Sequence, residues 1–262
     1  EVMKAVSSMR PGDVLMLENV RFHPGEEKND EEFGKQLAAL CDVYVNDAFA
    51  TAHRGHASNV AITKFVKEKA AGLLMKNEIA YFEKALVDPA RPLVAIFGGA
   101  KISGKIQAIN NVLGKVDKIL IGGAMANTFF AAQGYEVGKS LYEAEMLETA
   151  RQVLANAADR KVKLYLPVDV VVADRLESSA ATKAVPVPEI PAGWLAADVG
   201  PATSLLFKEA LQGAKTIVWN GPLGAFEMGP FANGTFSLMR ALAESDAITI
   251  VGGGDTDTAL HK

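Results

Sequence analysis

Short apolar runs alternate along the chain with longer segments in which apolar residues recur at helical spacing. The short runs are typical of strands buried on both faces, and their alternation with helices predicts a doubly wound α/β fold. The predicted strands are residues 93–97, 118–121, 163–166, 216–219 and 248–251. The predicted helices between them are residues 105–116, 143–159, 202–211 and 231–244. Residues 185–191 contain three prolines and are expected to form a surface connection, because proline fits neither a helix interior nor a central strand.

The first part of the chain shows the same alternation on a smaller scale. Its predicted elements are a strand at 14–18, a helix at 31–40, a strand at 43–46 and a long helix at 70–86. Asn29 and Asp30 supply N-cap residues for the first helix. Asp88 and Pro89 end the long helix, because a residue before proline is disfavoured in the helical region.

Four of the later predicted strands run directly into glycine-containing loops. Glycine permits a positive φ and a close approach of the backbone to a ligand. In an open parallel sheet, ligands bind outside the carboxyl ends of the strands. The pattern therefore predicts one large nucleotide-like site along one edge of the sheet. The four loops are Gly98-Gly99-Ala100-Lys101, Gly122-Gly123, Asn220-Gly221-Pro222-Leu223-Gly224 and Gly252-Gly253-Gly254-Asp255-Thr256.

Composition restricts the class of protein. A length of 262 residues fits one large or two ordinary soluble domains, and 49% of the residues are hydrophobic, which is enough for a sizeable core. The net charge of −4 gives no indication of a nucleic-acid partner. No apolar stretch is long enough to span a bilayer, and the first residues do not resemble a signal peptide, so no membrane partner and a cytoplasmic location are expected. The single cysteine, Cys41, excludes an internal disulfide, and its apolar helical surroundings predict a buried side chain.

Two lysines next to the first glycine loop are candidate phosphate ligands. Lys101 and Lys105 are four residues apart at a predicted helix start, where free backbone amides and positive charge together suit phosphate oxygens. The alternative is a pair of solvated lysines, which the helix dipole disfavours. Gly99-x4-Gly104-Lys105 also fits most of a P-loop, but Ile106 stands where that motif needs Ser or Thr.

Other candidates have both an ordinary and a functional interpretation. Asp255 follows three glycines and could be an N-cap or a Mg²⁺ ligand, and the two roles are compatible. Arg21 and Arg54 suit a phosphate or a carboxylate, but Arg21 is equally consistent with a surface cation. His53 and His56 are more consistent with packing or solvation than with catalysis.

Seven segments resemble phosphoglycerate kinases and occur in the order found in that family. One such motif would be weak, whereas seven in order are specific, and together they cover nearly the whole chain. The segments are Leu17-Glu18-Asn19-Val20-Arg21-Phe22, Val45-Asn46-Asp47-Ala48-Phe49, Thr51-Ala52-His53-Arg54, Gly98-Gly99-Ala100-Lys101, Leu166-Pro167-Val168-Asp169, Val218-Trp219-Asn220-Gly221-Pro222 and Gly252-Gly253-Gly254-Asp255-Thr256.

The resemblance implies two Rossmann-like lobes with parallel sheets joined by a long helix. On this basis residues 1–72 are expected to form part of an N-terminal acid-substrate lobe, 73–88 the interdomain helix, and 89–262 the C-terminal nucleotide-binding lobe. The first lobe is expected to be incomplete, because the family's opening strands have no counterpart here. The family's last glycine-rich helix start is also without a counterpart, so the resemblance implies a chain that is incomplete at both ends. The family also implies a monomer.

The implied reaction is the glycolytic, reversible transfer of a phosphoryl group between 1,3-bisphosphoglycerate and MgADP, giving 3-phosphoglycerate and MgATP. The attacking oxygen is already ionised, so no general base is needed. The resemblance assigns catalysis to Lys101, Arg21 and Gly254, and Mg²⁺ to Asp255. It assigns the acid substrate to Arg21, Arg54 and His53. The residues it assigns to ADP or ATP are Gly99, Ala100, Lys101, Lys105, Gly122, Gly123, Leu141, Asn220, Gly221, Pro222, Gly224, Glu227, Gly253, Gly254, Asp255 and Thr256.

Two other functions compete with this one. An inactive nucleotide-binding fragment is the alternative from a different class, because the family's remaining acid-substrate anchors are missing. An NAD-dependent oxidoreductase is disfavoured, since no Gly-x-Gly-x-x-Gly follows the first strand of either lobe. Within the resemblance, Gly104 stands where the family often has Asp, and Ala197 places a small side chain at the expected adenine pocket.

Overall fold

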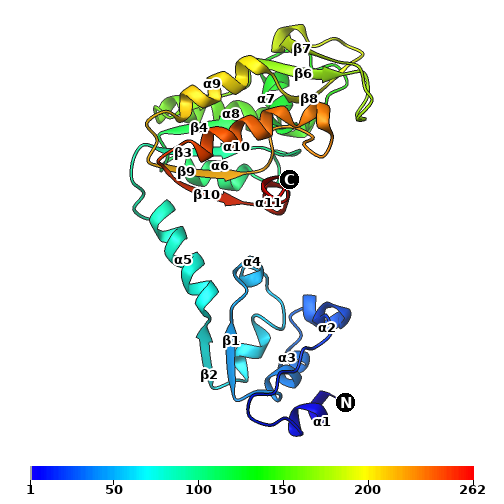
Figure 1. Cartoon of the computed structure of the whole chain (residues 1–262), viewed down its shortest axis with the longest axis vertical. Helices are drawn as coiled ribbons and strands as arrows, with labels where there is room; N and C mark the ends of the chain where they lie inside the picture. Colours follow the sequence, from blue (N-terminus) through cyan, green and yellow to red (C-terminus); the bar gives the residue numbers. More distant parts are fainter. Residues whose placement is uncertain (1) are drawn as a thin grey trace. The chain divides into compact units, whose positions relative to one another are not determined.

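The computed structural model describes residues 2–262 (Figure 1). Glu1, with which the first predicted domain begins, lies outside the described residues, as does the side chain of Leu86 in the predicted long helix. The chain divides into two compact units, Glu1–Phe82 and Glu83–Lys262, and helix α5 (Leu73–Leu86) begins in the first and ends in the second. The three-part division into 1–72, 73–88 and 89–262 stays a prediction.

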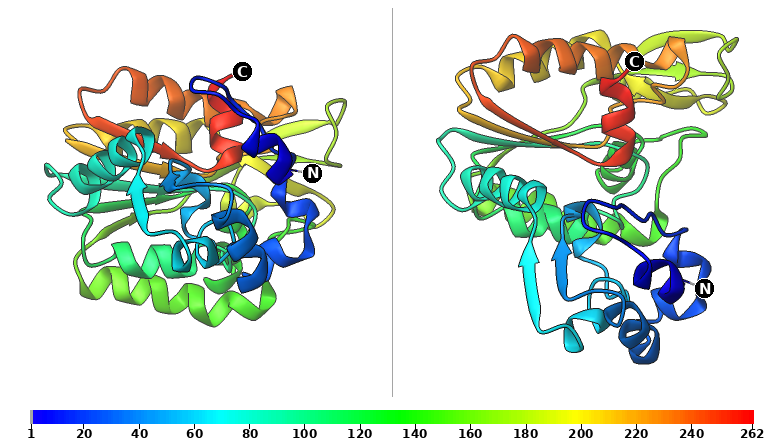
Figure 2. Two further views of the ribbon diagram at one scale, coloured as in Figure 1. Left: turned by 90° about the horizontal axis from the view of Figure 1, so that it is seen from below. Right: turned by 60° about the horizontal axis from the view of Figure 1, so that its bottom comes forward.

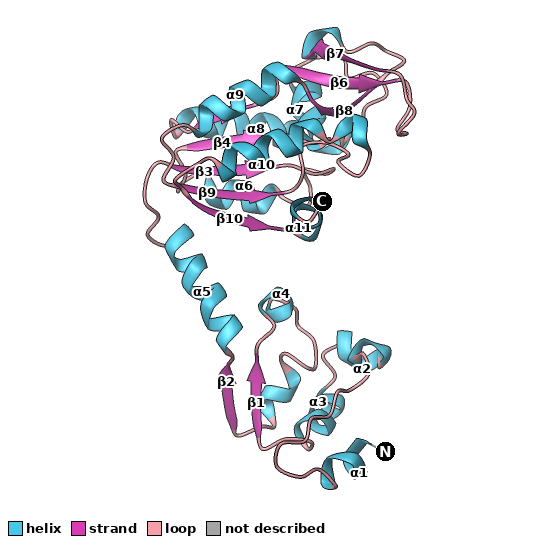
Figure 3. Ribbon diagram, in the orientation of Figure 1, coloured by secondary structure: helices cyan, strands magenta, loops and turns pink. Residues whose placement is uncertain are grey.

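The second unit is built on a five-stranded parallel sheet with strand order β10-β9-β3-β4-β5, and Figure 3 labels all of these strands except β5. All five predicted strands are confirmed, with ends that differ by at most one residue. The three central strands are mostly buried, which is the pattern expected of a covered parallel sheet, whereas the two edge strands are partly exposed. The strands are β3 (Leu93–Phe97), β4 (Lys118–Ile121), β5 (Lys163–Tyr165), β9 (Thr216–Asn220) and β10 (Ile248–Gly252).

Helices cover both faces of this sheet, as the two views of Figure 2 show. Successive side chains of β3 point to opposite faces, so that Leu93, Ala95 and Phe97 join one apolar core and Val94 and Ile96 join the other. The predicted doubly wound arrangement is therefore confirmed. The first core is packed by α6 (Ile106–Val112), α7 (Met125–Ala132) and α8 (Leu147–Asp159), and the second by α9 (Pro201–Leu211) and α10 (Asn233–Ala243).

The second unit also contains a small antiparallel sheet that the sequence did not reveal. Its order is β7-β6-β8, formed by β7 (Thr182–Pro186), β6 (Asp169–Ala173) and β8 (Leu195–Val199). The prediction that 185–191 is a surface connection was wrong, although the segment does not continue a central strand, as predicted. Val185 and Pro186 end the edge strand β7, where proline is tolerated, and the buried Val187 and Ile190 pack into the core.

Three predicted helices have different limits in the structure. The helix predicted at 105–116 is confined to α6, because the chain turns at Gly114, and the buried side chains of Leu113 and Val116 continue the apolar pattern beyond the helix. The helix predicted at 143–159 begins with a 3₁₀ turn, Ala144–Met146, before α8. The helix predicted at 231–244 likewise divides into the 3₁₀ turn Gly229–Phe231 and α10.

The first unit contains a two-stranded parallel sheet and a small core. Strand β1 (Val43–Asn46) is confirmed, and it pairs with β2 (Glu68–Ala71). The predicted helix at 31–40 is α3 (Glu31–Ala38), capped by Asp30, whose side chain accepts a hydrogen bond of 2.8 Å from the backbone N–H of Phe33. The shorter helices are α1 (Val2–Ser7), α2 (Pro24–Glu27), α4 (Phe49–Ala52), and the 3₁₀ turns Val20–Phe22 and Ala61–Lys64.

Three predictions for the first unit were wrong. Residues 14–18 form no strand, because a strand needs a neighbour for its backbone groups, and among the described residues of this unit only β1 and β2 pair. The long helix starts at Leu73 rather than residue 70, since the preceding residues pair with β1 as part of β2. Cys41 lies beyond the end of α3 and is exposed.

A buried glutamate ties α2 to the segment after α4, and its removal should destabilise the first unit. Glu26 is 2% exposed and accepts hydrogen bonds from Ser58 N (2.9 Å) and Ser58 Oγ (2.5 Å). We expect Glu26→Ala to lower the free energy of unfolding of this unit by about 2–3 kcal/mol, because buried donors lose a charged acceptor. Urea unfolding measures the change. The exposed Glu27→Ala is the control, and an equal effect in both variants would contradict this role.

Candidate functional site

A cavity of about 340 Å³ lies where four strands of the five-stranded sheet end. The loops that follow β3, β4 and β9 contribute glycines, and the loop after β10 contributes Asp255. The predicted convergence of the strand-end loops is thus observed within the second unit. The lining residues are Gly99, Ala100, Gly123, Ala124, Lys139, Leu141, Leu176, Leu195, Ala196, Ala197, Pro222, Gly224, Ala225, Glu227 and Asp255.

Direct backbone contacts between loops form the floor of this cavity. Gly99 N donates to Pro222 O at 2.8 Å, and Gly123 N donates to Leu223 O at 3.1 Å. Gly123 has a φ of 68°, and a Cβ atom there would lie 2.5 Å from Gly99 N and 2.8 Å from Pro222 O. Only glycine allows three chain segments to meet this closely. The sequence pattern of glycine after each strand therefore has a packing reason as well as a ligand-related one.

Lys105 binds the loop after β9. Its Nζ donates to the backbone oxygen of Asn220 at 2.9 Å and to the Oδ1 atom of the same residue at 2.5 Å. Burial lowers the pKa of Lys105, and the nearby carboxylate of Asp255 opposes this effect. A half-buried side chain held in this way joins the β3 loop to the β9 loop beside Asp255.

The loop after β10 is joined to the loop after β9 by a threonine. The backbone N–H of Gly221 donates to Thr256 Oγ1 at 2.8 Å, and Thr256 is fully buried. Gly253, with a φ of 97°, makes the turn into the short helix α11 (Gly254–Leu260). Trp219, also fully buried, donates from Nε1 to Gly221 O at 2.7 Å. Gly221 is therefore fixed from two sides.

The predicted nucleotide residues divide into those that line the cavity and those that support it. Gly122 packs against Leu223 behind the wall, and Gly254 begins α11. Lys101 is exposed and lies one residue beyond the lining residue Ala100. Those that line the cavity are Gly99, Ala100, Gly123, Leu141, Pro222, Gly224, Glu227 and Asp255, and those that join its loops are Lys105, Asn220, Gly221, Gly253 and Thr256.

Several wall residues had no signal in the sequence. Lys139, Leu176 and Leu195 line the cavity, but none of them follows a predicted strand. Leu176 and Leu141 are 48% and 53% exposed, so the cavity presents apolar surface to solvent. Only the proximity of Lys139 to Leu141 along the chain could have indicated one of these residues. The antiparallel sheet brings in the others, and it was not predicted.

Asp198 lies buried behind the wall formed by its neighbour Ala197. Its carboxylate accepts hydrogen bonds from Val199 N at 2.9 Å and Gly234 N at 2.8 Å. Burial raises the pKa of Asp198 to about 7, although both hydrogen bonds favour the charged form. A Cβ atom on Gly224, which lines the cavity, would collide with this carboxylate. Asp198 therefore supports the cavity wall without lining it.

Metal chemistry at this site depends on Asp255. Among residues 2–262, no group of three His, Cys, Asp or Glu side chains is placed to hold a metal ion. Mg²⁺ commonly uses one or two carboxylates together with substrate phosphates, so a full protein cage is not required. Asp255 is exposed on the cavity, and its carboxylate is the type of oxygen ligand that Mg²⁺ prefers. The residues present at this site therefore fit a Mg²⁺ ion that is also bound by substrate phosphates.

The predicted acid-substrate residues belong to the first unit. Arg21 lies in the 3₁₀ turn Val20–Phe22, while His53 and Arg54 follow α4, and all three side chains are exposed. In the described part of the chain, no hydrogen bond or ion pair joins Arg21 to either of the others. Asn59, which the sequence did not reveal, donates from Nδ2 to Thr51 O at 2.6 Å and to Arg54 O at 3.4 Å, and so holds this loop.

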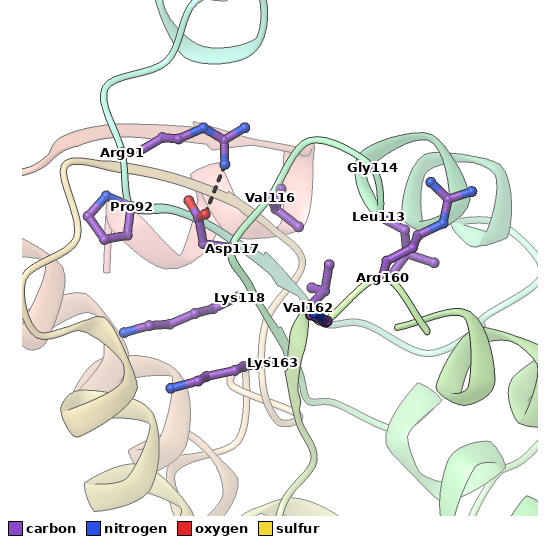
Figure 4. A pocket seen from close by; sticks show the side chains of 11 residues that line it. Arg91, Pro92, Leu113, Gly114, Val116, Asp117, Lys118, Arg160, Val162 and Lys163 are labelled. Carbon is purple, nitrogen blue, oxygen red and sulfur yellow. Dashed lines mark hydrogen bonds and ion pairs between the residues drawn. The ribbon is translucent and has the colours of Figure 1, made fainter. Parts of the chain in front are cut away.

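A larger cavity of about 650 Å³ lies at the opposite, amino-terminal ends of β3, β4 and β5 (Figure 4). Several of its cations already have structural partners. Arg91 Nη1 donates to Asp117 Oδ1 at 2.9 Å, Lys118 Nζ donates to Ala210 O near the end of α9 at 2.6 Å, and Arg160 is the C-cap of α8. Cations at helix carboxyl ends are stabilising without any ligand. Size alone therefore does not make this cavity the functional site.

Comparison with known proteins identifies the family of this chain. A family model described as phosphoglycerate kinase matches residues 1–262. Over the whole chain, the phosphoglycerate kinases of Geotalea uraniireducens and Citrifermentans bemidjiense are 60% and 61% identical, and the chain spans 65% and 66% of their lengths. The structure of phosphoglycerate kinase from Coxiella burnetii matches with a TM-score of 0.87 and 46% identity, covering 97% of this chain and 65% of that one. The chain belongs to the phosphoglycerate kinase family.

Proposed function

We propose that this chain serves the reversible, glycolytic transfer of a phosphoryl group between 1,3-bisphosphoglycerate and MgADP, giving 3-phosphoglycerate and MgATP. The observation that carries the proposal is the cavity at the strand ends, where glycine turns, Leu141, Glu227 and Asp255 meet. Family membership supports the same reaction. A cytoplasmic monomer belongs to the same proposal. In the described part of the chain, no helix is both long and apolar enough to cross a membrane.

The nucleotide is proposed to bind along this cavity. Leu141 presents half-exposed apolar surface on which an adenine ring can lie, with the Gly122-Gly123 turn beside it. Glu227 supplies a carboxylate for the ribose hydroxyls. The phosphates are proposed to follow the remaining assigned residues, which are Gly99, Ala100, Lys101, Lys105, Asn220, Gly221, Pro222, Gly224, Gly253, Gly254, Asp255 and Thr256.

Lys101 and Lys105 are proposed to have different tasks. Lys105 is already hydrogen-bonded to Asn220, so it binds a resting phosphate from a fixed position. Lys101 is exposed, and its ammonium has no hydrogen-bond partner among residues 2–262, so it is available to the phosphoryl group during transfer. Phosphoryl transfer needs mainly positioning and neutralisation of spread negative charge. A Mg²⁺ ion held by Asp255 would add positive charge at the phosphate oxygens.

The acid substrate is proposed to bind to the first unit through Arg21, Arg54 and His53. Guanidinium groups can bind a carboxylate or phosphate through two parallel hydrogen bonds. Asn59 would keep the His53–Arg54 loop in place through its two main-chain contacts. Arg21 and Gly254 are further proposed to act on the reacting groups, by a charge and a backbone N–H respectively.

A MgADP titration of this chain tests the nucleotide part of the proposal. Trp219 is fully buried and contacts Gly221 through its indole N–H, so we expect binding at the cavity to change its fluorescence and to saturate. In Trp219→Phe only Trp194 remains, so any fluorescence change of this variant on adding MgADP comes from Trp194. Saturable heat in calorimetry without a fluorescence change would show that MgADP binds but Trp219 does not report it. The absence of both signals would contradict the proposed nucleotide site.

A coupled assay separates catalysis from binding alone. With 3-phosphoglycerate and MgATP present, the proposed function predicts steady formation of ADP. The alternative, an inactive nucleotide-binding fragment, predicts MgADP binding without this turnover.

A further inference from the structure

A buried glutamate joins two walls of the candidate nucleotide cavity. Glu143 is 8% exposed and lies two residues after the wall residue Leu141. Its Oε2 accepts a hydrogen bond from Ser103 N at 3.0 Å, and its Oε1 accepts one from Ser103 Oγ at 2.5 Å. The nearby backbone N–H of Ile102 also favours the charged form of Glu143. These bonds reach across 40 positions of the sequence, from the Leu141 wall to the loop that carries Lys101.

The electrostatics of the contact keep Glu143 negatively charged. Burial acts to raise its pKa, but the hydrogen bonds from Ser103 and Ile102, together with the positive charge of Lys101, outweigh burial and lower the pKa. Charge-assisted hydrogen bonds of this kind are stronger than neutral ones. The loop between β3 and α6 is therefore held by an ionised side chain beside Lys101.

The main chain around Glu143 is fixed independently of its carboxylate. Glu143 N donates to Thr128 Oγ1 at 3.1 Å, and Leu141 O accepts from Asn127 Nδ2 at 3.0 Å. Asn127 and Thr128 both belong to α7, and both are buried. Loss of the Glu143 side chain would therefore leave Leu141 in place and release only the segment at Ile102 and Ser103.

We infer that Glu143 is a positioning residue that holds the Lys101 loop for the phosphates of the nucleotide, while contributing little to binding of the adenosine part. The inference rests on the proposed function, because it takes the cavity to bind a nucleotide. It assigns Glu143 no direct contact with the substrate. The residue acts through Ser103 and Ile102 on the backbone between Ala100 and Lys105, and Ile102 O accepts a hydrogen bond from Lys105 N at 2.8 Å. Ala100 and Lys105 are both proposed to bind the resting phosphates, so the expected loss of MgADP affinity does not depend on the ammonium of Lys101.

Matched ligands separate this role from a general effect on folding. We expect Glu143→Ala to weaken MgADP binding by about tenfold or more, since a charged hydrogen bond is lost. Adenosine affinity should change by less than about twofold. Glu143→Gln should recover part of the loss, because it keeps the shape and one acceptor. Calorimetry with each ligand measures the split, and thermal unfolding records stability.

Asp169→Asn is the matched control. Asp169 also accepts backbone hydrogen bonds, from Ala202 N at 3.0 Å and Thr203 N at 2.7 Å, but it does not line the cavity. We expect this control to lower the unfolding temperature without separating the two affinities. Equal losses for MgADP and adenosine in Glu143→Ala, or no loss for either, would overturn the positioning role.

Two further measurements keep the inference testable. If Glu143→Ala does not fold, Ser103→Ala can be used instead, because it removes one of the two Ser103 donors. It should weaken MgADP binding more than adenosine binding, by a smaller factor than Glu143→Ala. If the unaltered chain binds neither MgADP nor adenosine, the proposed function has failed. The contact between Glu143 and Ser103 is then tested without a ligand. Amide hydrogen exchange at Ile102 and Ser103 should then be faster in Glu143→Gln than in the unaltered chain, and an unchanged rate would contradict the inference.

Discussion

Replacing Lys101 by alanine should lower turnover by about 10²–10³-fold and leave nucleotide affinity nearly unchanged, which is typical of loss of one group that stabilises charge in a transition state. The reason is the difference between the two lysines of the loop. Lys105 is hydrogen-bonded to Asn220, whereas Lys101 is exposed beside the lining residue Ala100. The measurement is kcat in a preparation that transfers phosphoryl groups, together with the MgADP dissociation constant.

Lys115→Ala is the control for Lys101→Ala. Lys115 is an exposed lysine of the same unit that lies before β4, at the opposite end of the strands. Its loss changes the net charge by the same amount and should alter neither kcat nor affinity. Equal losses of turnover and MgADP affinity in Lys101→Ala would show that Lys101 binds the resting nucleotide and has no catalytic role.

The stability of the second unit should decrease by about 3 kcal/mol between pH 5 and pH 8 because of Asp198. Burial raises the pKa of this carboxyl from 3.8 to about 7. Between pH 3.8 and about pH 7, the folded state therefore keeps a proton on Asp198 that the unfolded state has already lost. This contribution to stability is complete below about pH 4 and is lost as the pH rises to about 7.

Asp198→Asn isolates this effect, because asparagine does not titrate. Its unfolding free energy should vary less with pH than that of the unaltered chain, and the difference between the two urea-unfolding curves gives the contribution of Asp198. One acceptor remains for Val199 N and Gly234 N, so some loss of stability at pH 5 is expected. Parallel pH profiles for the two proteins would show that Asp198 does not titrate in this range.

The parallel strands of the second unit could be predicted because their signal is local. A run such as Leu93–Phe97 is apolar at every position, and burial on both faces is the only arrangement that removes all its side chains from water. The glycines that follow each strand were equally visible, and they determined which residues form the floor of the cavity. The larger part of the candidate site could therefore be recognised from the amino-acid sequence.

Elements that depend on a distant partner could not be predicted in this way. Residues 14–18 have a strand-like composition but form no strand, while Glu68–Ala71 has little apolar character and pairs with β1. Cys41 was expected to be buried because it continues the apolar pattern of α3, but the helix ends before it. For residues 14–18 and Glu68–Ala71, the presence or absence of a pairing partner decided the conformation.

The sequence by itself determined the α/β class, the parallel strands and the glycine loops, because apolar runs and glycine act through neighbouring residues. Only the tertiary structure decided how the candidate charged groups are used. It bound Lys105 to Asn220, left Lys101 exposed, and brought Glu143 to Ser103 across 40 positions. Hydrogen bonds and burial depend on distance in space, and the folded chain alone sets those distances.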